Sequence, residues 1–311
     1  MKRGHSSDRE SNLLALNRLK TDTDFKSAGG VVSSNLTVPI FLNLDNVAFS
    51  RNDFIRGITI PKFLNADLAE DIGIQIGDGG IFVYKEKDGD THYRIECYGH
   101  INEDISYFNT VIIPLKQKLF NVKPDIKIHK TAGTCYIRIN SKAINTFYHY
   151  AIGLPRNNKC KIITIPKIIL NSSNEILAAC IRGITDTDFS LSFGKRGNDY
   201  SYPILHLTSA SKKLIFQLHY YLKRFGIFSN VTYDYGEYDF RTGKTYIKNN
   251  LFVNGNKNFE YWIEHIGFCN PVHATKYLIW KRYGYCPPKT TLKQRIDILK
   301  DNTYLRSLGK Q

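Results

Sequence analysis

Two stretches decide the fold, and the first reads Leu68-Ala-Glu-Asp-Ile-Gly-Ile-Gln-Ile-Gly-Asp-Gly79. The second, Leu177-Ala-Ala-Cys-Ile-Arg-Gly-Ile-Thr-Asp-Thr-Asp-Phe189, has the same character. Each is a mostly apolar run with several small residues, which predicts a helix that ends on an acid, Asp78 or Asp188. Small residues along one helix face let a second backbone come very close. We therefore expect the two helices to pack together and to bring both terminal carboxylates to one place.

These stretches belong to an internal duplication. Ile58-Thr-Ile-Pro-Lys62 recurs as Ile163-Thr-Ile-Pro-Lys167, and each copy precedes one of the two helices. The acids are 188 − 78 = 110 residues apart and the prolines are 166 − 61 = 105 residues apart. Two independent landmarks with nearly the same offset indicate a repeat. The chain therefore divides into an N-terminal extension (1–57), a first repeat (58–162) and a second repeat with a basic tail (163–311).

Each repeat shows the same order of elements: helix, hairpin, helix, hairpin, helix. In the first, β-branched and aromatic residues alternate around turns at 88–90 and 132–133, which predicts two hairpins. Apolar spacing predicts a helix over 105–120, which Pro114 would kink or split. The basic tail is expected to be helical near 292–299. The fold class is therefore α+β, with two pseudo-symmetric αββαββα repeats, each an antiparallel four-stranded sheet covered by helices on one face.

The charge of the chain points to a polyanionic partner. The 311 residues include 43 Lys and Arg against 28 Asp and Glu, a net charge of +15. Such an excess favours nucleic acid, with an anionic membrane surface as the rival. No run approaches the ~18 apolar residues of a membrane span, and no apolar segment follows the basic start. We therefore expect a soluble, intracellular protein and no membrane partner.

The six cysteines form no Cys-x-x-Cys pair, which indicates free thiols in a reducing compartment. His265, Cys269 and His273 recur every four residues, as the ligands of a metal site on one helix would. Pro271 interrupts this run, and no fourth ligand is near in the sequence. A zinc site is therefore not expected there.

The strand positions that alternate away from the core are rich in Lys, Arg and Tyr. On a twisted sheet face such residues suit a DNA groove, with phosphate contacts for affinity and base contacts for specificity. The plainer interpretation is a solvated outer face. In the first repeat the candidate DNA-binding residues are Lys85, Lys87, Arg94, Lys127, His129, Lys130 and Arg138. In the second they are Lys195, Arg196, Tyr200, Tyr202, Tyr233, Tyr235, Arg241, Lys244 and Lys248.

The two terminal acids, Asp78 and Asp188, are the candidate catalytic groups. One Asp after an apolar helix is usually a turn or cap residue, but two in register within a duplication indicate a paired role. Carboxylate and backbone carbonyl oxygens suit Mg²⁺, or another divalent cation such as Mn²⁺. Such a cation polarises phosphoryl oxygens, activates a water and stabilises the leaving oxygen. One acid per repeat, beside a basic groove, is the arrangement for cutting both strands of DNA.

The two motifs, Ile74-Gln-Ile-Gly-Asp-Gly79 and Arg182-Gly-Ile-Thr-Asp-Thr-Asp188, resemble those of the LAGLIDADG homing endonuclease family in its single-chain, two-repeat form. The resemblance spans residues 58 to 285. It implies a monomer whose two halves form a saddle in the major groove of a long DNA site. It also implies cleavage across the minor groove that leaves short 3′ overhangs. Phe189 stands where the family usually has Gly, which predicts an altered local geometry and weaker cleavage, but not a different fold.

The resemblance also implies roles for individual residues. Asp78 and Asp188 would bind the metal ions, with the carbonyl oxygens of Gly77 and Thr187 nearby. The family places a basic residue, often Lys, just after each closing helix. Lys159 and Lys276 occupy such segments, and their catalytic role would be to stabilise phosphate charge or to order the attacking water. For either lysine the alternative is a simple phosphate contact or a solvated side chain.

The expected activity is a site-specific, metal-dependent double-strand cut in DNA. The alternative is a non-cleaving nucleic-acid binder on the same scaffold, either an intron RNA maturase or a DNA-binding regulator. The presence of both acids favours the nuclease, whereas Phe189 keeps the binder, and intron RNA as its partner, in consideration. An intein would begin with Cys or Ser and end with His-Asn. Because this chain starts with Met1-Lys2 and ends with Gly309-Lys-Gln311, we expect a free-standing protein.

Overall fold

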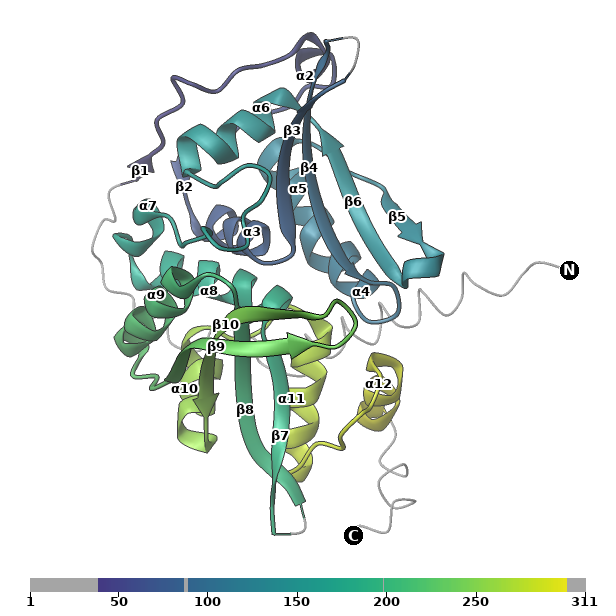
Figure 1. Ribbon diagram of the computed structural model, residues 1–311, viewed down its shortest axis with the longest axis vertical. Coiled ribbons are helices and arrows are strands. Elements are labelled where there is room, and N and C mark those ends of the chain that lie inside the picture. The colour runs from purple at the N-terminus through teal and green to yellow at the C-terminus, as the bar shows by residue number, and fades with distance from the viewer. Residues whose placement is uncertain (1–38, 87–88, 198, 301–311) are drawn as a thin grey trace, which may run out of the picture. The chain divides into compact units, whose positions relative to one another are not determined.

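Two helices, α3 (Ala66–Ile76) and α8 (Asn174–Asp188), lie side by side where the two halves of the chain meet (Figure 1). Each helix begins at a polar cap: Asn65 Oδ1 accepts a hydrogen bond from Leu68 N (2.9 Å), and Ser173 Oγ accepts one from Ile176 N (3.4 Å). The predicted pairing of the two motif helices is therefore confirmed.

The structure is a computed structural model, and it describes residues 39–86, 89–197 and 199–300. From Pro39 onward the chain forms one compact unit. Lys87 and the part of the predicted extension before residue 39 lie outside the described residues. Among the residues described, no helix combines the length and the hydropathy needed to cross a membrane.

The contact between α3 and α8 is made by backbone. A Cβ atom added to Gly73 would lie 2.1 Å from the carbonyl oxygen of Cys180, and one added to Gly183 would lie 2.2 Å from that of Glu70. Both distances are far below any real contact, so each position accepts only glycine without movement of a helix. The small residues that suggested close approach in the sequence therefore stand at the point of contact.

The first repeat contains a four-stranded antiparallel sheet in the order β3-β4-β6-β5. Its strands are β3 (Gly79–Lys85), β4 (Thr91–His100), β5 (Ile126–His129) and β6 (Thr134–Asn140). Its remaining helical segments are α4 (Ile105–Tyr107), η1 (Phe108–Ile112), α5 (Ile113–Phe120), η2 (Lys130–Ala132), α6 (Lys142–Thr146) and η3 (Phe147–Ile152). Ile74 of α3 packs with Cys97, Phe108 and Ile137 in the buried core of this repeat.

The second repeat has an equivalent sheet in the order β7-β8-β10-β9. Its strands are β7 (Ser190–Arg196), β8 (Asp199–Ser209), β9 (Asn230–Asp239) and β10 (Lys244–Asn254). Its helices besides α8 are α7 (Lys167–Leu170), α9 (Lys212–Leu222), η4 (Lys223–Phe225), α10 (Asn256–His265), α11 (Pro271–Tyr283) and α12 (Leu292–Lys300). The predicted α+β fold with two like repeats is confirmed, as is a helix in the basic tail.

Two prolines explain where helices break. The predicted helix over 105–120 is split: the short α4 leads into a π-helical turn, and α5 follows with Pro114 in its first turn. Proline lacks the N–H that a helix interior needs, so it is tolerated at this position. Pro271 likewise begins α11. His265 therefore ends α10, Cys269 lies in the loop, and the three residues with a spacing of four do not share a helix face.

Residues 39–57, which the sequence assigned to the N-terminal extension, pack against the first repeat. They include β1 (Ile40–Phe41), which pairs with β2 (Phe63–Leu64), and α2 (Arg51–Ile55). Asp53 is fully buried, and one of its carboxylate oxygens accepts hydrogen bonds from Ser50 N (2.8 Å) and Ala143 N (3.1 Å). That carboxylate thus joins α2 to α6.

We predict that Gly73→Ala destabilises the protein by about 1–3 kcal/mol or more, because the new methyl group meets backbone of α8 that can move only with the whole helix. Chemical denaturation measures this change. Gly236→Ala is the matched control, since its Cβ would meet two side-chain methyl groups in the β9–β10 hairpin, that of Thr245 at 3.3 Å and Cδ1 of Ile247 at 3.9 Å. Equal stability of the Gly73→Ala and Gly236→Ala proteins would contradict the prediction.

Candidate functional site

The C-terminal ends of α3 and α8 touch. A Cβ atom on Gly77 would lie 1.9 Å from Thr187 Oγ1 and 3.3 Å from the carboxyl carbon of Asp188. Helix α8 runs through Asp188, whereas α3 ends at Ile76 and Asp78 follows two residues later. The two predicted acids thus come together although Asp188 is the last residue of its helix and Asp78 lies just beyond the end of its own.

The position after each acid explains this difference. Gly79 leaves no room for a side chain, since a Cβ there would lie 2.4 Å from the Gln75 Cα atom. Phe189 instead turns into the core of the second repeat, where it is buried and its ring lies 5.6 Å from that of Trp262. Phe189 is in an extended conformation directly after the helix. Phe189 in place of Gly therefore accompanies a backbone geometry at the end of α8 that differs from that at the end of α3, although the two repeats have the same fold.

Both acids hold their protons more tightly than usual. Burial, then the charges of Asp188 and Asp104, raises the pKa of Asp78 to about 8, against the influence of Lys159. Asp188 reaches solvent on one side, yet the protein packed around its carboxyl raises its pKa to about 6. Two carboxyl groups this close together repel each other once both are ionised. A divalent cation would supply positive charge to offset this repulsion.

Lys159 is the nearest cation to both acids. Its ammonium group donates hydrogen bonds to the carbonyl oxygens of Gln75 (2.9 Å), Ile76 (2.7 Å) and Gly77 at the end of α3. Burial lowers the pKa of Lys159, while the charge of Asp188 acts in the opposite direction. A cation at a helix C-terminus is favourable because the unpaired carbonyls carry partial negative charge.

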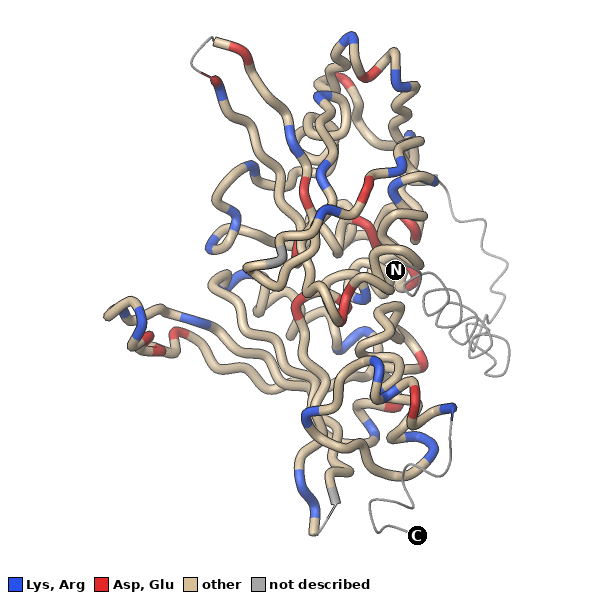
Figure 2. Tube along the Cα trace, turned by 90° about the vertical axis from the view of Figure 1, so that its right-hand side faces the viewer, with Lys and Arg blue, Asp and Glu red and all other residues tan. Residues whose placement is uncertain are grey.

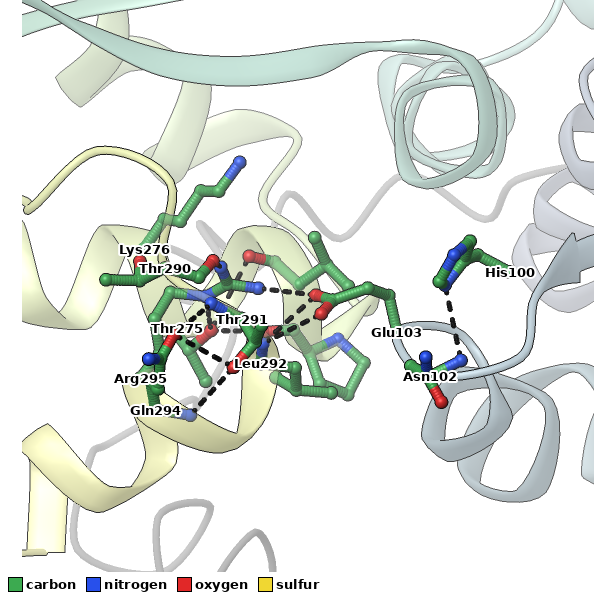
Figure 3. Close-up of polar contacts among 12 residues, drawn as sticks. His100, Asn102, Glu103, Thr275, Lys276, Thr290, Thr291, Leu292, Gln294 and Arg295 are labelled. Carbon is green, nitrogen blue, oxygen red and sulfur yellow. Dashed lines mark hydrogen bonds and ion pairs between the residues drawn. The ribbon is translucent and has the colours of Figure 1, made fainter. Parts of the chain in front are cut away.

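Lys276 has different surroundings. On α11, its ammonium group donates to the carbonyl oxygen of Leu191 (2.7 Å), at the start of β7. Its pKa is lowered by burial and then by the charge of Arg295. Figure 3 shows it next to the polar contacts that hold α12. The two lysines are thus not equivalent in position, and the catalytic role of each stays a prediction.

Those contacts tie the tail of the second repeat to the first. Both carboxylate oxygens of Glu103 accept a hydrogen bond from Leu292 N (3.1 Å), and one also pairs with the Arg295 guanidinium (3.0 Å) (Figure 3). Arg295 is almost fully buried and also donates to Thr275 Oγ1 (3.0 Å). Helix α12 therefore bridges α11 and the loop before α4.

The donor atoms at the touching helix ends fit a hard divalent cation. The two carboxylates and the Gly77 carbonyl are oxygen ligands of the type that Mg²⁺ or Mn²⁺ takes. The raised pKa of each carboxyl shows that negative charge there lacks compensation. Thr187 Oγ1 donates to the carbonyl oxygens of Gly183 (2.9 Å) and Ile184 (3.0 Å) within its own helix, which fixes the residue against Gly77.

Sequence reasoning missed Asp104, whose negative charge adds to the rise in the pKa of Asp78. Asp104 Oδ2 accepts a hydrogen bond from His100 N (2.8 Å), and its Oδ1 accepts one from Asn270 Nδ2 (3.3 Å) of the second repeat. In the sequence, Asp104 stands directly before the predicted helix over 105–120. Nothing local in the sequence signals its approach to Asp78.

The open sheet face of the first repeat carries fewer free charges than expected. Glu96, itself buried, pairs with Arg138 (2.5 Å) and with Arg94 (3.7 Å), and accepts a hydrogen bond from Tyr98 (2.6 Å). These two predicted DNA-binding arginines are thus partly neutralised within the sheet. The other predicted residues of this face with described side chains, all exposed, are Lys85, Lys127 and His129.

The second sheet also mixes free and paired groups, and Lys and Arg positions recur along strands that project from both repeats (Figure 2). The Arg196 guanidinium lies 4.9 Å from the centre of the Tyr202 ring. Lys248 pairs with Glu237 (2.5 Å), and Arg241 pairs with Asp239 (3.3 Å). Four other predicted residues are exposed: Lys195, Tyr200, Tyr235 and Lys244.

Tyr233, a predicted DNA-binding residue, does not lie on the open face of the second sheet, and three polar residues that do lie there were not predicted. Tyr233 lies 5.4 Å from the ammonium group of Lys212 on α9, near the helix side of the sheet. On the outer side, Thr208 Oγ1 donates to Asn250 Oδ1 (2.8 Å), and the His206 ring stacks on Phe252 at 4.2 Å. Strict alternation with the buried residues of β8 and β10 could have identified these positions.

Comparison with known proteins gives one match to a family model. Residues 175–267 match the model described as a LAGLIDADG-like domain. This match lies within the second repeat. The matched range runs from α8 through both hairpins to the end of α10, and the first repeat has the same sheet order. The family resemblance noted from the sequence is thus confirmed for the second motif, which lies inside the matched range.

A much longer protein also matches part of this chain. It belongs to the A-type ATP synthase of Pyrococcus abyssi (strain GE5 / Orsay) and is 26% identical over 174 residues, which is 56% of this chain and 15% of that protein. The chain thus spans only a small part of that relative's length.

Solved structures with similar arrangements include I-DmoI in complex with DNA and Mn, at 20% identity and a TM-score of 0.46, over 65% of this chain and 96% of that one. I-SmaMI bound to uncleaved DNA with calcium has 14% identity and a TM-score of 0.44, over 76% and 98%. The I-LtrWI LAGLIDADG homing endonuclease bound to target DNA has 12% identity and a TM-score of 0.45, over 71% and 90%.

We predict that metal-free Asp78→Asn protein is more stable than the unchanged protein at high pH. The folded chain keeps the Asp78 proton up to about pH 8, whereas an unfolded chain loses it near the ordinary pKa of 3.8. The folded state therefore binds more protons across this window, and its free energy of unfolding falls as pH rises. Asn has no such titration, so the variant should gain roughly 1–3 kcal/mol at about pH 8 and nothing near pH 4.

Urea denaturation in a chelator at several pH values measures this difference. Asp45→Asn, in an exposed loop, is the matched control and should show no pH-dependent gain. A stability difference for Asp78→Asn that stays constant from acid to alkaline pH would show that the proton on Asp78 is not its source.

Proposed function

We propose that this protein is a site-specific DNA endonuclease that uses a divalent cation at Asp78 and Asp188 to cut both strands. The observation that supports this most strongly is the contact between the ends of α3 and α8. There, the carboxyl groups of Asp78 and Asp188, one from each repeat, come together. The LAGLIDADG-like domain in the second repeat supports the same assignment.

The residues of the site would divide the work as follows. Asp78, Asp188 and the carbonyl oxygens of Gly77 and Thr187 would hold Mg²⁺ or Mn²⁺. Once bound, the cation supplies charge stabilisation for phosphoryl oxygens and lowers the pKa of a coordinated water. Each carboxyl must lose its proton to bind the cation, so the raised pKa of Asp78 sets a proton in competition with the metal. The backbone contact between the helices fixes the distance between the acids.

Lys159 would act from the first repeat. Its ammonium group already lies at the Gly77 carbonyl, so it is placed to hold positive charge next to the metal ligands. Positive charge there would stabilise negative charge that builds up on a phosphate during cleavage. Lys276 would take the same role for the second repeat from a different position, at the Leu191 carbonyl oxygen in β7.

The protein would bind double-stranded DNA as a monomer, through the open faces of its two sheets. Exposed Lys and Arg at their edges suit phosphate contacts, while Asn250, Thr208 and His206 on the second face offer donors and acceptors for base edges. The net charge of +15 favours the same partner.

We predict that the purified protein linearises a plasmid that carries the locus surrounding its own reading frame, in the presence of Mg²⁺. Asp78→Asn and Asp188→Asn should each lower the rate of double-strand cleavage by at least about a hundredfold, because each removes one charged metal ligand. Gel analysis of supercoiled, nicked and linear plasmid follows both strands at once.

Binding is measured on the same proteins in Ca²⁺ by a gel-shift titration. Both Asn variants should keep their affinity, and Asp45→Asn should keep both binding and cutting. A protein that binds this DNA but never cuts it, with both acids present, would instead identify a non-cleaving binder. Undiminished cutting by Asp188→Asn would remove that residue from the mechanism.

We also predict that DNA affinity falls steeply with salt, since each neutralised phosphate releases counterions. A double variant, Lys127→Ala with Arg196→Ala, should reduce the slope of log affinity against log salt by about two. Lys118→Ala with Lys213→Ala removes the same charge from exposed helix positions of α5 and α9 and is the matched control. Equal slopes for both double variants would place the bound DNA elsewhere than on the sheet faces.

A further inference from the structure

A second cluster of ionisable side chains lies on the other side of α8 from Asp188. Asp186 is two residues earlier, which turns its side chain about 200° around the helix. Ligand atoms of Asp186, Glu70 and Cys269 all lie within 4.8 Å of one another. They come from α8, from α3, and from the loop between α10 and α11. The cluster therefore joins both repeats at their seam.

Both carboxylates of this cluster are buried, and each keeps one oxygen without a hydrogen bond. Glu70 Oε2 accepts from Arg182 (2.6 Å), whereas Glu70 Oε1 has no partner. Asp186 Oδ2 accepts from Cys269 N (2.7 Å), whereas Asp186 Oδ1 has none. Glu70 is 7% exposed and Asp186 is 2% exposed, so water does not readily replace the missing partner. Buried oxygens left in this way cost free energy unless something binds them.

His273 adds a fourth group. Its Nδ1 atom lies 3.6 Å from the free oxygen of Asp186 and is itself buried without a hydrogen bond. Carboxylate oxygen, thiolate sulfur and imidazole nitrogen are the three ligand types that Zn²⁺ takes in proteins. The sequence suggested no zinc site around Cys269 because no fourth ligand was near. The fold supplies Glu70 and Asp186 from distant helices.

The net charge of the cluster favours the binding of a divalent cation. With the His273 imidazole neutral, as it is when its nitrogen binds a metal, two buried carboxylates face one guanidinium, that of Arg182, and one negative charge is unmatched. When a metal binds a cysteine, it replaces the thiol proton, which passes to solvent. Two carboxylates, one thiolate, one guanidinium and one divalent cation then sum to zero charge.

We propose that Glu70, Asp186 and Cys269 bind a divalent transition-metal ion, for which Zn²⁺ is the best match, with His273 as the candidate fourth ligand. The sulfur ligand favours zinc over magnesium, which prefers oxygen alone. This site is separate from the hard-oxygen site at Asp78 and Asp188. Because it connects α3, α8 and the loop before α11, its role is to hold the repeats together.

The site has no counterpart in the duplication. The offset of 110 residues between the motifs places Asp186 opposite Ile76 and Glu70 opposite Cys180. Neither Ile76 nor Cys180 would repeat the ligand set. One metal ion per chain is therefore expected at this cluster, in addition to any ion that Asp78 and Asp188 bind.

The test uses the full chain, stripped of metal with a chelator and then titrated with Zn²⁺. We expect about one zinc per chain by elemental analysis after gel filtration, and a melting temperature that rises with zinc. Cys269→Ser and Asp186→Asn should lose both effects. Co²⁺ in place of Zn²⁺ should give a near-ultraviolet thiolate-to-metal absorption band in the unchanged protein, and none in Cys269→Ser.

Two controls make the result specific. Cys160→Ser, at an exposed cysteine, should keep the zinc and the cobalt band. Asp78→Asn should keep them too, since it alters only the other site. The melting curve of the metal-free Cys269→Ser protein reports whether this variant folds. If it does not fold, the cobalt band of the unchanged protein and of Cys160→Ser decides whether a cysteine other than Cys160 binds the metal.

A folded chain that takes up no zinc, or that keeps zinc and the band in Cys269→Ser, would overturn the proposal. Neither outcome bears on DNA cleavage, which the Asp78 and Asp188 variants test separately.

Discussion

The backbone contact between Gly73 and Gly183 is the constraint on which the rest of the structure depends. With no side chain between them, α3 and α8 come close enough for the Gly73 Cβ position to fall 2.1 Å from a carbonyl oxygen of the other helix. That closeness brings the helix ends together, and with them Asp78 and Asp188. It also positions the two four-stranded sheets, since α3 is followed by β3 and α8 by β7, the first strand of each sheet.

The same closeness creates the electrostatic problem of the seam. Carboxylates from both repeats gather at the seam, on one side of α8 at Asp188, which reaches solvent, and on the other at Asp186, which is buried. Positive charge is supplied unevenly, by Lys159 at one place and by Arg182 at the other. The cations that we propose at each site would complete this balance, with oxygen ligands alone on one side and a sulfur ligand on the other.

Much of this arrangement could be predicted from the sequence, and the limits have a physical cause. The paired helices, the hairpins and the two acids follow from short-range patterns: glycine spacing, alternation, and an acid after an apolar run. Asp104, Glu96 and Glu103 were missed because their partners lie in other elements or in the other repeat. Lys276 could be placed after a closing helix by resemblance, but its contact with Leu191 depends on tertiary packing.

The backbone contact between Gly73 and Gly183 is nearly symmetric, but the two sheet faces are not. Glu96 gathers two arginines on the first face, whereas His206, Thr208 and Asn250 form a neutral polar group on the second. Two identical protein chains related by a two-fold axis would be restricted to palindromes. A single chain whose halves have diverged escapes that restriction. If the faces bind DNA as we propose, the left and right halves of the target are therefore different sequences, and the protein can bind it in only one orientation.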